Sequence, residues 1–307
     1  MPEPVGVIIP VVTIFDDQGE LDLAGTASNI EWLIAAGVDA LLVCGSCGEF
    51  SALEEGERCR VVEAAVEAAA GRVPVFAGVM HTATEVARRL ARHAERAGAD
   101  AVMSVPPYYS SGPEREILQY FHDVADAVEI PLIVYNNPGA AGVGLTIQQL
   151  SALAQDGTAA MIKESHGDPA RIHDLRLSCP AQTRLIYGED YGALEALLGG
   201  ADGWVAGIGN VVPELAAALY RATCALDVLT ARRLWFELLP LINMTSFKPM
   251  FGRPDERPDY IQIFKAGLTL RGRPGGVPRR PLLELPAADV DHLRELLGAL
   301  RVVEPAV

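Results

Sequence analysis

Lys163, Lys248 and Lys265 are the only lysines in this 307-residue sequence, and the other 22 of its 25 basic residues are arginines. Arginine keeps its proton in proteins, so an amine nucleophile has to come from one of these three positions. Lys163 follows the apolar run 159–162, which predicts a strand buried on both faces. Burial lowers the pKa of a lysine, and the neutral amine can attack a carbonyl carbon to form an imine. Lys163 is therefore the candidate nucleophile.

Hydroxyl and phenol side chains follow other apolar runs and could serve such a lysine. Tyr135 ends the apolar run that precedes that of Lys163, and imine formation needs a group that donates and accepts protons. Ser46 ends another run, and its hydroxyl can pass a proton on by rotating. Gly45 and Gly48 on either side of it leave backbone N–H groups uncovered, which suits a carboxylate. Together these residues predict imine chemistry on a carbonyl compound, with a backbone cradle for a carboxylate.

The elements that must position these residues follow from the hydrophobic pattern. Short β-branched runs alternate with longer amphipathic stretches, which predicts parallel strands joined by helices. The predicted strands are residues 6–15, 40–46, 73–79, 101–105, 131–136, 160–165, 184–188 and 203–206. The predicted helices between them include 54–70, 84–97, 114–128, 147–154 and 191–198. Eight such units predict an α/β fold, a closed (β/α)8 TIM barrel, with its reactive groups at the carboxyl ends of the strands.

The last part of the sequence differs from the rest. Helices predicted at 228–247, 259–270 and 287–300 have no strand between them, so they cannot extend a closed barrel. We expect a catalytic barrel over residues 1–224 and a C-terminal three-helix extension, residues 225–307, whose apolar faces pack on the barrel or on another subunit. Gly37, Gly98 and Gly200 each stand where a predicted helix ends and a strand begins, which is the usual place for a glycine helix stop.

Charge and composition exclude several kinds of partner. Asp and Glu outnumber Lys and Arg by 40 to 25, which gives a formal net charge of −15 at pH 7. A surface this acidic repels phosphate backbones and anionic lipids, so we expect neither nucleic acid nor a membrane as a partner. The first apolar run is interrupted by Pro10 and is too short to span a bilayer. We predict a cytoplasmic protein whose five cysteines, including Cys44 and Cys47, are reduced thiols.

Two other classes of function stay open at this point. The segment 207–210 follows the eighth predicted strand and could hold a sugar phosphate in a phosphate-binding barrel, although no Lys or Arg lies near it in the sequence. The other class is a catalytically silent barrel that binds a metabolite. The six histidines lack the spacing of a metal site, so we expect no metal and no cofactor. Glu189 and Asp190, near the seventh strand end, could contact a polar substrate.

Several motifs together resemble a known family, the dihydrodipicolinate synthase and N-acetylneuraminate lyase superfamily of class I, Schiff-base-forming lyases. They are Gly45-Ser46-Cys47-Gly48-Glu49, Pro107-Tyr108-Tyr109, Tyr135-Asn136-Asn137-Pro138, Ile162-Lys163-Glu164, Gly200-Ala201-Asp202-Gly203-Trp204 and Phe264-Lys265-Ala266. The resemblance implies that Lys163 forms the Schiff base, that Tyr135 carries the proton and that Ser46 and Tyr109 form a relay. It also implies a homotetramer in which Tyr109 crosses from a neighbouring subunit.

The same resemblance suggests which residues bind substrate. These candidates are Gly45, Cys47, Gly48, Val205, Asn137 and Ala140. Cys47 stands where the family has threonine, which leaves backbone donors for a carboxylate but weakens the side-chain contact. Ala140 stands where the lysine-biosynthetic synthase has an arginine, so a bidentate carboxylate clamp is missing. We therefore expect cleavage, dehydration or deamination of a hydroxylated 2-oxo acid or cyclic imine. The alternative is 4-hydroxy-tetrahydrodipicolinate synthase itself, which joins pyruvate to aspartate semialdehyde.

Overall fold

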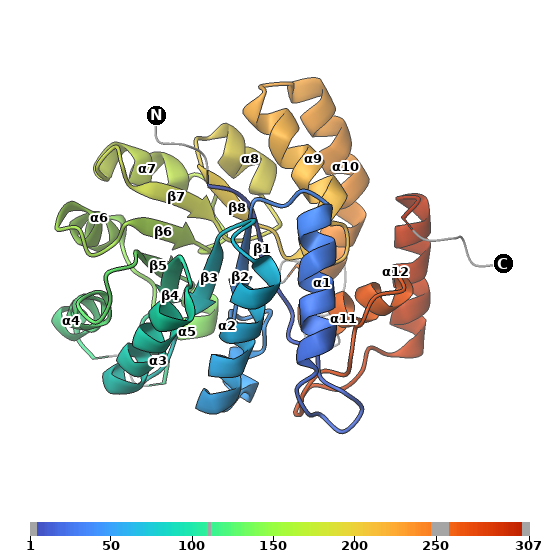
Figure 1. Cartoon of the computed structure of the whole chain (residues 1–307). Helices are drawn as coiled ribbons and strands as arrows, with labels where there is room; N and C mark the ends of the chain where they lie inside the picture. Colours follow the sequence, from blue (N-terminus) through green and yellow to red (C-terminus); the bar gives the residue numbers. More distant parts are fainter. Residues whose placement is uncertain (1–4, 110–111, 247–257, 303–307) are drawn as a thin grey trace.

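Eight parallel strands pair in sequence order, and β8 pairs with β1 to close a barrel (Figure 1). The computed structural model describes residues 5–109, 112–246 and 258–302. The strands are β1 (Gly6–Pro10), β2 (Ala40–Val43), β3 (Val75–Gly78), β4 (Ala101–Ser104), β5 (Leu132–Asn136), β6 (Met161–Glu164), β7 (Arg184–Tyr187) and β8 (Gly203–Val205). The predicted (β/α)8 barrel is confirmed, and each strand lies within a predicted apolar run.

Helices cover the outside of the barrel (Figure 1). Those of the barrel are α1 (Leu23–Ala35), α2 (Glu55–Ala69), α3 (Thr84–Ala97), α4 (Glu114–Ala125), the short α5 (Pro138–Ala141), α6 (Ile147–Gln155), α7 (Arg171–Ser178), α8 (Ala193–Leu198) and α9 (Pro213–Cys224). Two short 3₁₀ helices, η1 (Phe50–Ala52) and η2 (Ile208–Asn210), follow β2 and β8. Gly37, Gly98 and Gly200 have φ values of 84°, 94° and 104°, so these glycine helix stops use the left-handed conformation that glycine allows.

All eight strands are shorter than the sequence predicts, and β1 and β2 both end well before their predicted ends. The first was expected to reach Phe15, but β1 ends at Pro10, and Phe15 instead forms an isolated antiparallel bridge with Leu21. The second was expected to reach Ser46, but β2 ends at Val43 because Cys44 has a φ of 53°, which is incompatible with an extended strand. This turn begins the loop that carries Ser46 at the carboxyl end of the barrel.

Side chains alternate between two hydrophobic clusters. Met161 of β6 belongs to the cluster inside the barrel, together with Tyr135 of β5, whereas Ile162 belongs to the larger cluster between the strands and the helices. Residues two apart on a strand share a face, so Lys163 points inward with Met161.

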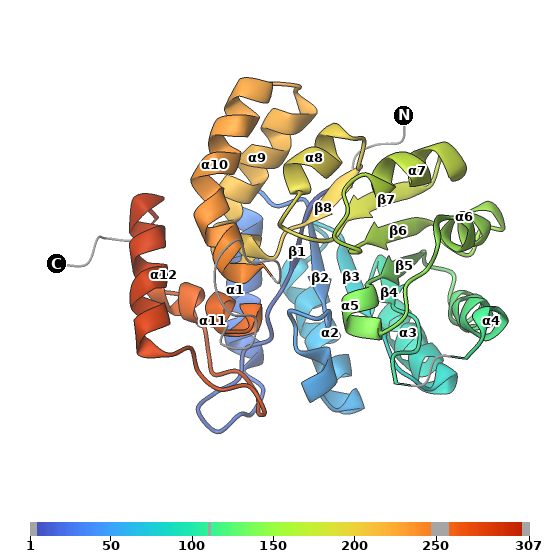
Figure 2. The same ribbon diagram turned by 180° about the vertical axis from the view of Figure 1, so that it is seen from behind.

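Three further helices follow the barrel: α10 (Val228–Thr245), α11 (Tyr260–Leu270) and α12 (Ala287–Ala299). Figures 1 and 2 show them on one side of the barrel, where α10 packs on α9 and α12 packs on α11. The Asp259 side chain caps α11 and forms a capping box with Gln262, which determines where this helix begins. The three predicted C-terminal helices are confirmed, although residue 247, the predicted end of the first, lies outside the described residues. The division into two domains at residue 224 stays a prediction. Within the described residues, no helix is long and apolar enough to cross a membrane.

Candidate active site

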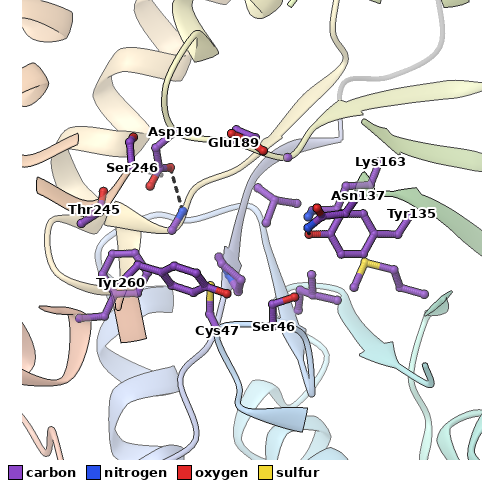
Figure 3. A pocket seen from close by; sticks show the side chains of 17 residues that line it. Ser46, Cys47, Tyr135, Asn137, Lys163, Glu189, Asp190, Thr245, Ser246 and Tyr260 are labelled. Atoms are coloured by element: carbon purple, nitrogen blue, oxygen red, sulfur yellow. Dashed lines mark hydrogen bonds between the residues drawn. The ribbon is translucent and has the colours of Figure 1, made fainter. Parts of the chain in front are cut away.

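Lys163 and Tyr135 are paired in register on the neighbouring strands β6 and β5. Lys163 is only 4% exposed, and its Nζ lies 3.4 Å from the centroid of the Tyr135 ring and 3.3 Å from Ser165 Oγ, to which it donates a hydrogen bond. The ring face attracts the ammonium electrostatically. The amine and the phenol are therefore held side by side, as the sequence predicts (Figure 3).

Gly188, directly after β7, leaves the space that the lysine occupies. A Cβ at this position would lie 2.0 Å from Ser165 Oγ, 2.8 Å from Lys163 Cε and 2.9 Å from Lys163 Nζ. These distances are shorter than van der Waals contact, so a side chain at residue 188 would displace the amine.

Glu164 fixes β6 from the other face of the strand. Its fully buried carboxylate accepts hydrogen bonds from Asn136 Nδ2 at 3.0 Å, from the His166 N–H at 2.8 Å and from Arg171 Nε at 3.1 Å. A buried carboxylate is stable only when it is paired and hydrogen-bonded in this way. Glu164 thus ties the ends of β5 and β6 together and keeps Tyr135 and Lys163 in register.

A pocket opens at the carboxyl ends of the strands, with Lys163 in its wall (Figure 3). It is lined by Pro10, Leu42, Ser46, Cys47, Met103, Tyr135, Asn137, Lys163, Gly188, Glu189, Asp190, Val205, Gly207, Thr245, Ser246, Tyr260 and Phe264. Six of the residues predicted from the sequence meet here: Ser46, Cys47, Tyr135, Asn137, Lys163 and Val205. Asn137 Nδ2 donates a hydrogen bond of 2.7 Å to the Tyr135 hydroxyl oxygen, which orients the phenol.

Four other predicted site residues do not line this pocket. Gly45 and Gly48 are buried within their loop, where the Gly48 carbonyl accepts a hydrogen bond from Thr13 Oγ1 at 2.8 Å. Ala140 is exposed on α5. The Tyr109 side chain is 90% exposed, so it lies outside the pocket of its own chain.

Carboxylates and hydroxyls form the wall farther from the strands. Glu189 and Asp190, which the sequence suggested as possible substrate contacts, both line the pocket. The Asp190 carboxylate accepts hydrogen bonds of 2.9 Å from the backbone N–H groups of Gly207 and Ile208. Burial nevertheless raises the pKa of Asp190 to about 7, because these two hydrogen bonds and the nearby charge of Lys163 lower it by less.

The C-terminal extension supplies pocket residues that sequence reasoning missed. Thr245 is the last residue of α10, Ser246 follows it, and Tyr260 and Phe264 come from α11. The apolar pattern of the helix predicted at 259–270 showed which face is buried, with Phe264 on it. The sequence carries no local signal of where that face docks, so Tyr260 could not be assigned to the site.

Two further features of the described residues are the thiols of Cys44 and Cys47 and the placement of metal-binding side chains. Cys44 and Cys47 are free thiols, and burial raises the pKa of each to about 12, which makes both poor nucleophiles at neutral pH. Across residues 5–109, 112–246 and 258–302, no group of three His, Cys, Asp or Glu side chains is placed to hold a metal ion.

A closed (β/α)8 barrel with a buried lysine beside a tyrosine at its carboxyl end is the architecture of a class I, imine-forming lyase. Comparisons with known proteins agree. The model of the Dihydrodipicolinate synthetase family matches residues 3–300. A 4-hydroxy-tetrahydrodipicolinate synthase from Acidiphilium cryptum (strain JF-5) is 34% identical over 295 residues, which cover 96% of this chain and 98% of that protein.

Solved structures show the same relationship. Dihydrodipicolinate synthase from Aquifex aeolicus has a TM-score of 0.89 at 30% identity, over 97% of this chain and 99% of that one. YagE, a prophage protein of the dihydrodipicolinic acid synthase family from E. coli K12 solved in complex with pyruvate, has a TM-score of 0.89 at 32% identity, with the same coverage. The chain belongs to the dihydrodipicolinate synthetase family, and the predicted enzyme class, a Schiff-base-forming lyase of the class I aldolase type, is confirmed.

Proposed function

We propose that Lys163 forms an imine with a 2-oxo acid, pyruvate or a derivative of it, and that the enzyme cleaves, dehydrates or deaminates a hydroxylated 2-oxo acid or cyclic imine. The observation that carries this proposal is the pocket itself. A buried amine and a phenol stand at its strand end, and carboxylates and hydroxyls stand at its far end. The pyruvate complex of the relative YagE supports the 2-oxo acid part.

The chemistry follows from the positions of three groups. The Lys163 amine attacks the substrate's keto carbon, a C–N bond forms, and water leaves after a proton reaches the carbinolamine oxygen. The Tyr135 hydroxyl beside the amine donates that proton and takes one back, and Ser46 exchanges protons with it across the pocket. Backbone N–H groups at Ser46 and Cys47 bind the carboxylate of the substrate, with Gly45 and Gly48 shaping their loop.

The far end of the pocket determines which 2-oxo acid fits. Among the described residues that line it, Lys163 is the single cationic side chain, whereas Glu189 and Asp190 are acidic. A substrate with a second carboxylate would place that charge near these acids without a partner, which is costly in a buried site. Hydroxyl groups can instead donate hydrogen bonds to the carboxylates and to the Thr245 hydroxyl oxygen, whose own proton is donated to the Ile242 carbonyl at 3.1 Å. Ala140, exposed on α5, supplies no cation either.

Condensation of pyruvate with aspartate semialdehyde is the second candidate, because the relative from Acidiphilium cryptum is named for that activity. A phosphate-binding barrel is disfavoured by Asp190. Its carboxylate oxygens already accept the N–H groups of Gly207 and Ile208, and the carboxylate would repel a phosphate at that turn.

The quaternary structure belongs to the proposal as well. We propose a cytoplasmic homotetramer in which Tyr109 serves the site of a neighbouring subunit. Its 90% exposed ring supports this, because an aromatic side chain so exposed can be buried by a second copy. Sedimentation velocity measures the assembly, and a fully active monomer would show that Tyr109 has no such role.

Borohydride trapping tests the imine. The wild-type protein is incubated with pyruvate and borohydride, digested, and the modified lysine is located by mass spectrometry. We expect the adduct on Lys163 and none on Lys265, which serves as the internal control because it is buried as well, 2% exposed, but ion-paired to Glu49. Lys163→Arg keeps the charge and should abolish both the adduct and turnover. An adduct on Lys265 or Lys248 would refute the assignment; Lys248 lies outside the described residues.

Substrate choice is tested by comparing kcat/KM on one preparation. Hydroxylated 2-oxo acids are compared with pyruvate plus aspartate semialdehyde. We expect turnover of the hydroxylated acids to be more efficient. Efficient condensation without turnover of any hydroxylated acid would show that another group replaces the missing arginine and that the second candidate is right.

A further inference from the structure

The C-terminal extension places the Tyr260 side chain beside Ser46 in the pocket. Both residues line the pocket, and Figure 3 shows the Tyr260 hydroxyl pointing toward Ser46. Hydrogen bonding with the Ser46 side chain lowers the pKa of Tyr260, although burial raises that pKa by more, well above its usual value. Tyr260 therefore stays a neutral phenol that can both donate and accept a hydrogen bond.

A buried ion pair fixes Tyr260 relative to Ser46. Glu49 lies three residues after Ser46 in the same loop, and Lys265 lies five residues after Tyr260 on α11. Lys265 Nζ is 2.7 Å from Glu49 Oε1, and both side chains are 2% exposed. The contact joins the loop of Ser46 to the helix of Tyr260, and moving the helix away from the loop would break a buried charge pair.

We propose that Tyr260 is a positioning residue of the active site, which holds the Ser46 hydroxyl in its working orientation from within the same chain. The inference rests on the proposed imine function and extends it. It assigns to the C-terminal extension a direct part in the proton relay, in addition to whatever a tyrosine of a second subunit contributes.

The physical need for such a residue comes from the freedom of serine. A serine hydroxyl rotates among three staggered orientations, and only one of them can face a proton carrier across the pocket. A fixed phenol that hydrogen-bonds to the hydroxyl favours one orientation and leaves its remaining lone pair or proton for the reaction. Loss of one such hydrogen bond is expected to slow proton transfer about tenfold.

Hydrogen exchange of pyruvate measures this step without a second substrate. When the imine becomes an enamine, a methyl C–H bond of pyruvate breaks and the proton passes to a basic group. A deuteron from D2O returns when the enamine reverts, and NMR follows the loss of the methyl signal. Borohydride trapping in the same sample gives the number of imine-competent subunits, so the exchange rate is expressed per competent site and unfolded protein does not contribute.

The test is a double-mutant cycle of Tyr260→Phe and Ser46→Ala. We expect Tyr260→Phe to lower the saturated exchange rate about tenfold with little change in the pyruvate concentration at half saturation. In the Ser46→Ala background the same change should have no further effect, because there is no hydroxyl left to hold. Tyr220→Phe is the matched control. Tyr220 is also buried, and its hydroxyl donates to the Asp202 carbonyl at 2.9 Å in a different part of the barrel, so this variant should lose stability and keep its exchange rate.

Each result has a clear consequence. The inference would be overturned if Tyr260→Phe exchanged pyruvate hydrogens at the wild-type rate. It would also be overturned if the rate losses of the two single variants multiplied in the double variant. Either result would leave the imine function intact. Absence of any trapped imine in the wild-type protein would instead refute the proposed function. A non-additive loss confined to the exchange rate supports the positioning role, since a merely structural tyrosine would lower the melting temperature without coupling to Ser46.

Discussion

Replacement of Lys265 by methionine tests the most buried charge pair in the described part of the chain. Lys265 Nζ contacts Glu49 Oε1 at 2.7 Å, donates to the Val277 carbonyl at 2.8 Å and lies 4.4 Å from the centroid of the Phe15 ring. Methionine matches the length of the lysine stem and removes the charge. Glu49 then keeps one hydrogen bond, from the Arg279 N–H at 2.8 Å, but loses its buried counterion.

The expected cost follows from the burial of both partners. Removing one partner of a buried ion pair destabilises a protein by about 3–5 kcal/mol, because the remaining charge is buried without compensation. At about 2.1 cal/mol/K of unfolding entropy per residue, this corresponds to a melting temperature lower by about 5–8 °C for a chain of 307 residues. Glu49→Gln should cost a similar amount. The double variant carries no unpaired charge, so it should be more stable than the sum of the two single effects predicts.

Urea unfolding followed by circular dichroism measures these differences. Arg233→Met is the control, since Arg233 pairs with Glu237 at 2.7 Å on the surface of α10 with side chains 59% and 46% exposed. An exposed pair of this kind contributes about 0.5 kcal/mol or less. Single-variant losses no larger than this control, or losses that add in the double variant, would refute the reasoning. The Lys265 variant should also slow pyruvate exchange, because the ion pair holds α11 against the loop of Ser46.

Three further predictions concern the site. Tyr135→Phe should fold and slow pyruvate exchange about 100-fold or more, the usual contribution of a positioned acid–base group, and a wild-type rate would remove this phenol from the mechanism. Treatment with EDTA should leave turnover unchanged, because the imine itself withdraws electrons from the bond that breaks at the adjacent carbon of the substrate. Loss of activity on EDTA treatment that a divalent ion restores would contradict this prediction. The pKa of Asp190 is raised from 3.8 to about 7 in the folded state, so the folded protein binds this proton more tightly than the unfolded chain does. The resulting contribution to stability is complete below about pH 4 and is lost as the pH rises through about 7. Asp190→Asn should remove that part of the decline in unfolding free energy between pH 4 and 7, and an unchanged slope would show that Asp190 titrates normally.

The barrel could be predicted because its signals are local. Each strand is a short apolar run, and glycines at positions such as 98 and 200 mark where a helix stops. The counts of strands and helices then left a closed barrel as the simplest arrangement. The ends of β1 and β2 could not be predicted, because they depend on individual backbone conformations. The left-handed φ of Cys44 is one of these, and it cannot be predicted from the fact that residue 44 is a cysteine.

The strand end of the pocket was predictable for a related reason. Lys163 and Tyr135 belong to consecutive strands, and parallel strands place their carboxyl ends together. Tyr260 has no such relation to Ser46. The two residues are far apart in the sequence, and they meet only because a buried face of α11 packs beside the loop after β2, a contact between distant segments that no periodicity encodes.

This difference between the two ends of the pocket has a consequence for how the site can change. Lys163 and Tyr135 are held by strand pairing, by Glu164 and by the space left at Gly188, so their relative position depends on the barrel itself. The far wall comes from the turn after β7 and from α10 and α11, where side chains can be exchanged without altering a strand. Imine formation should therefore be the constant property of this architecture, and the substrate should be determined by Glu189, Asp190 and the hydroxyls of the C-terminal extension.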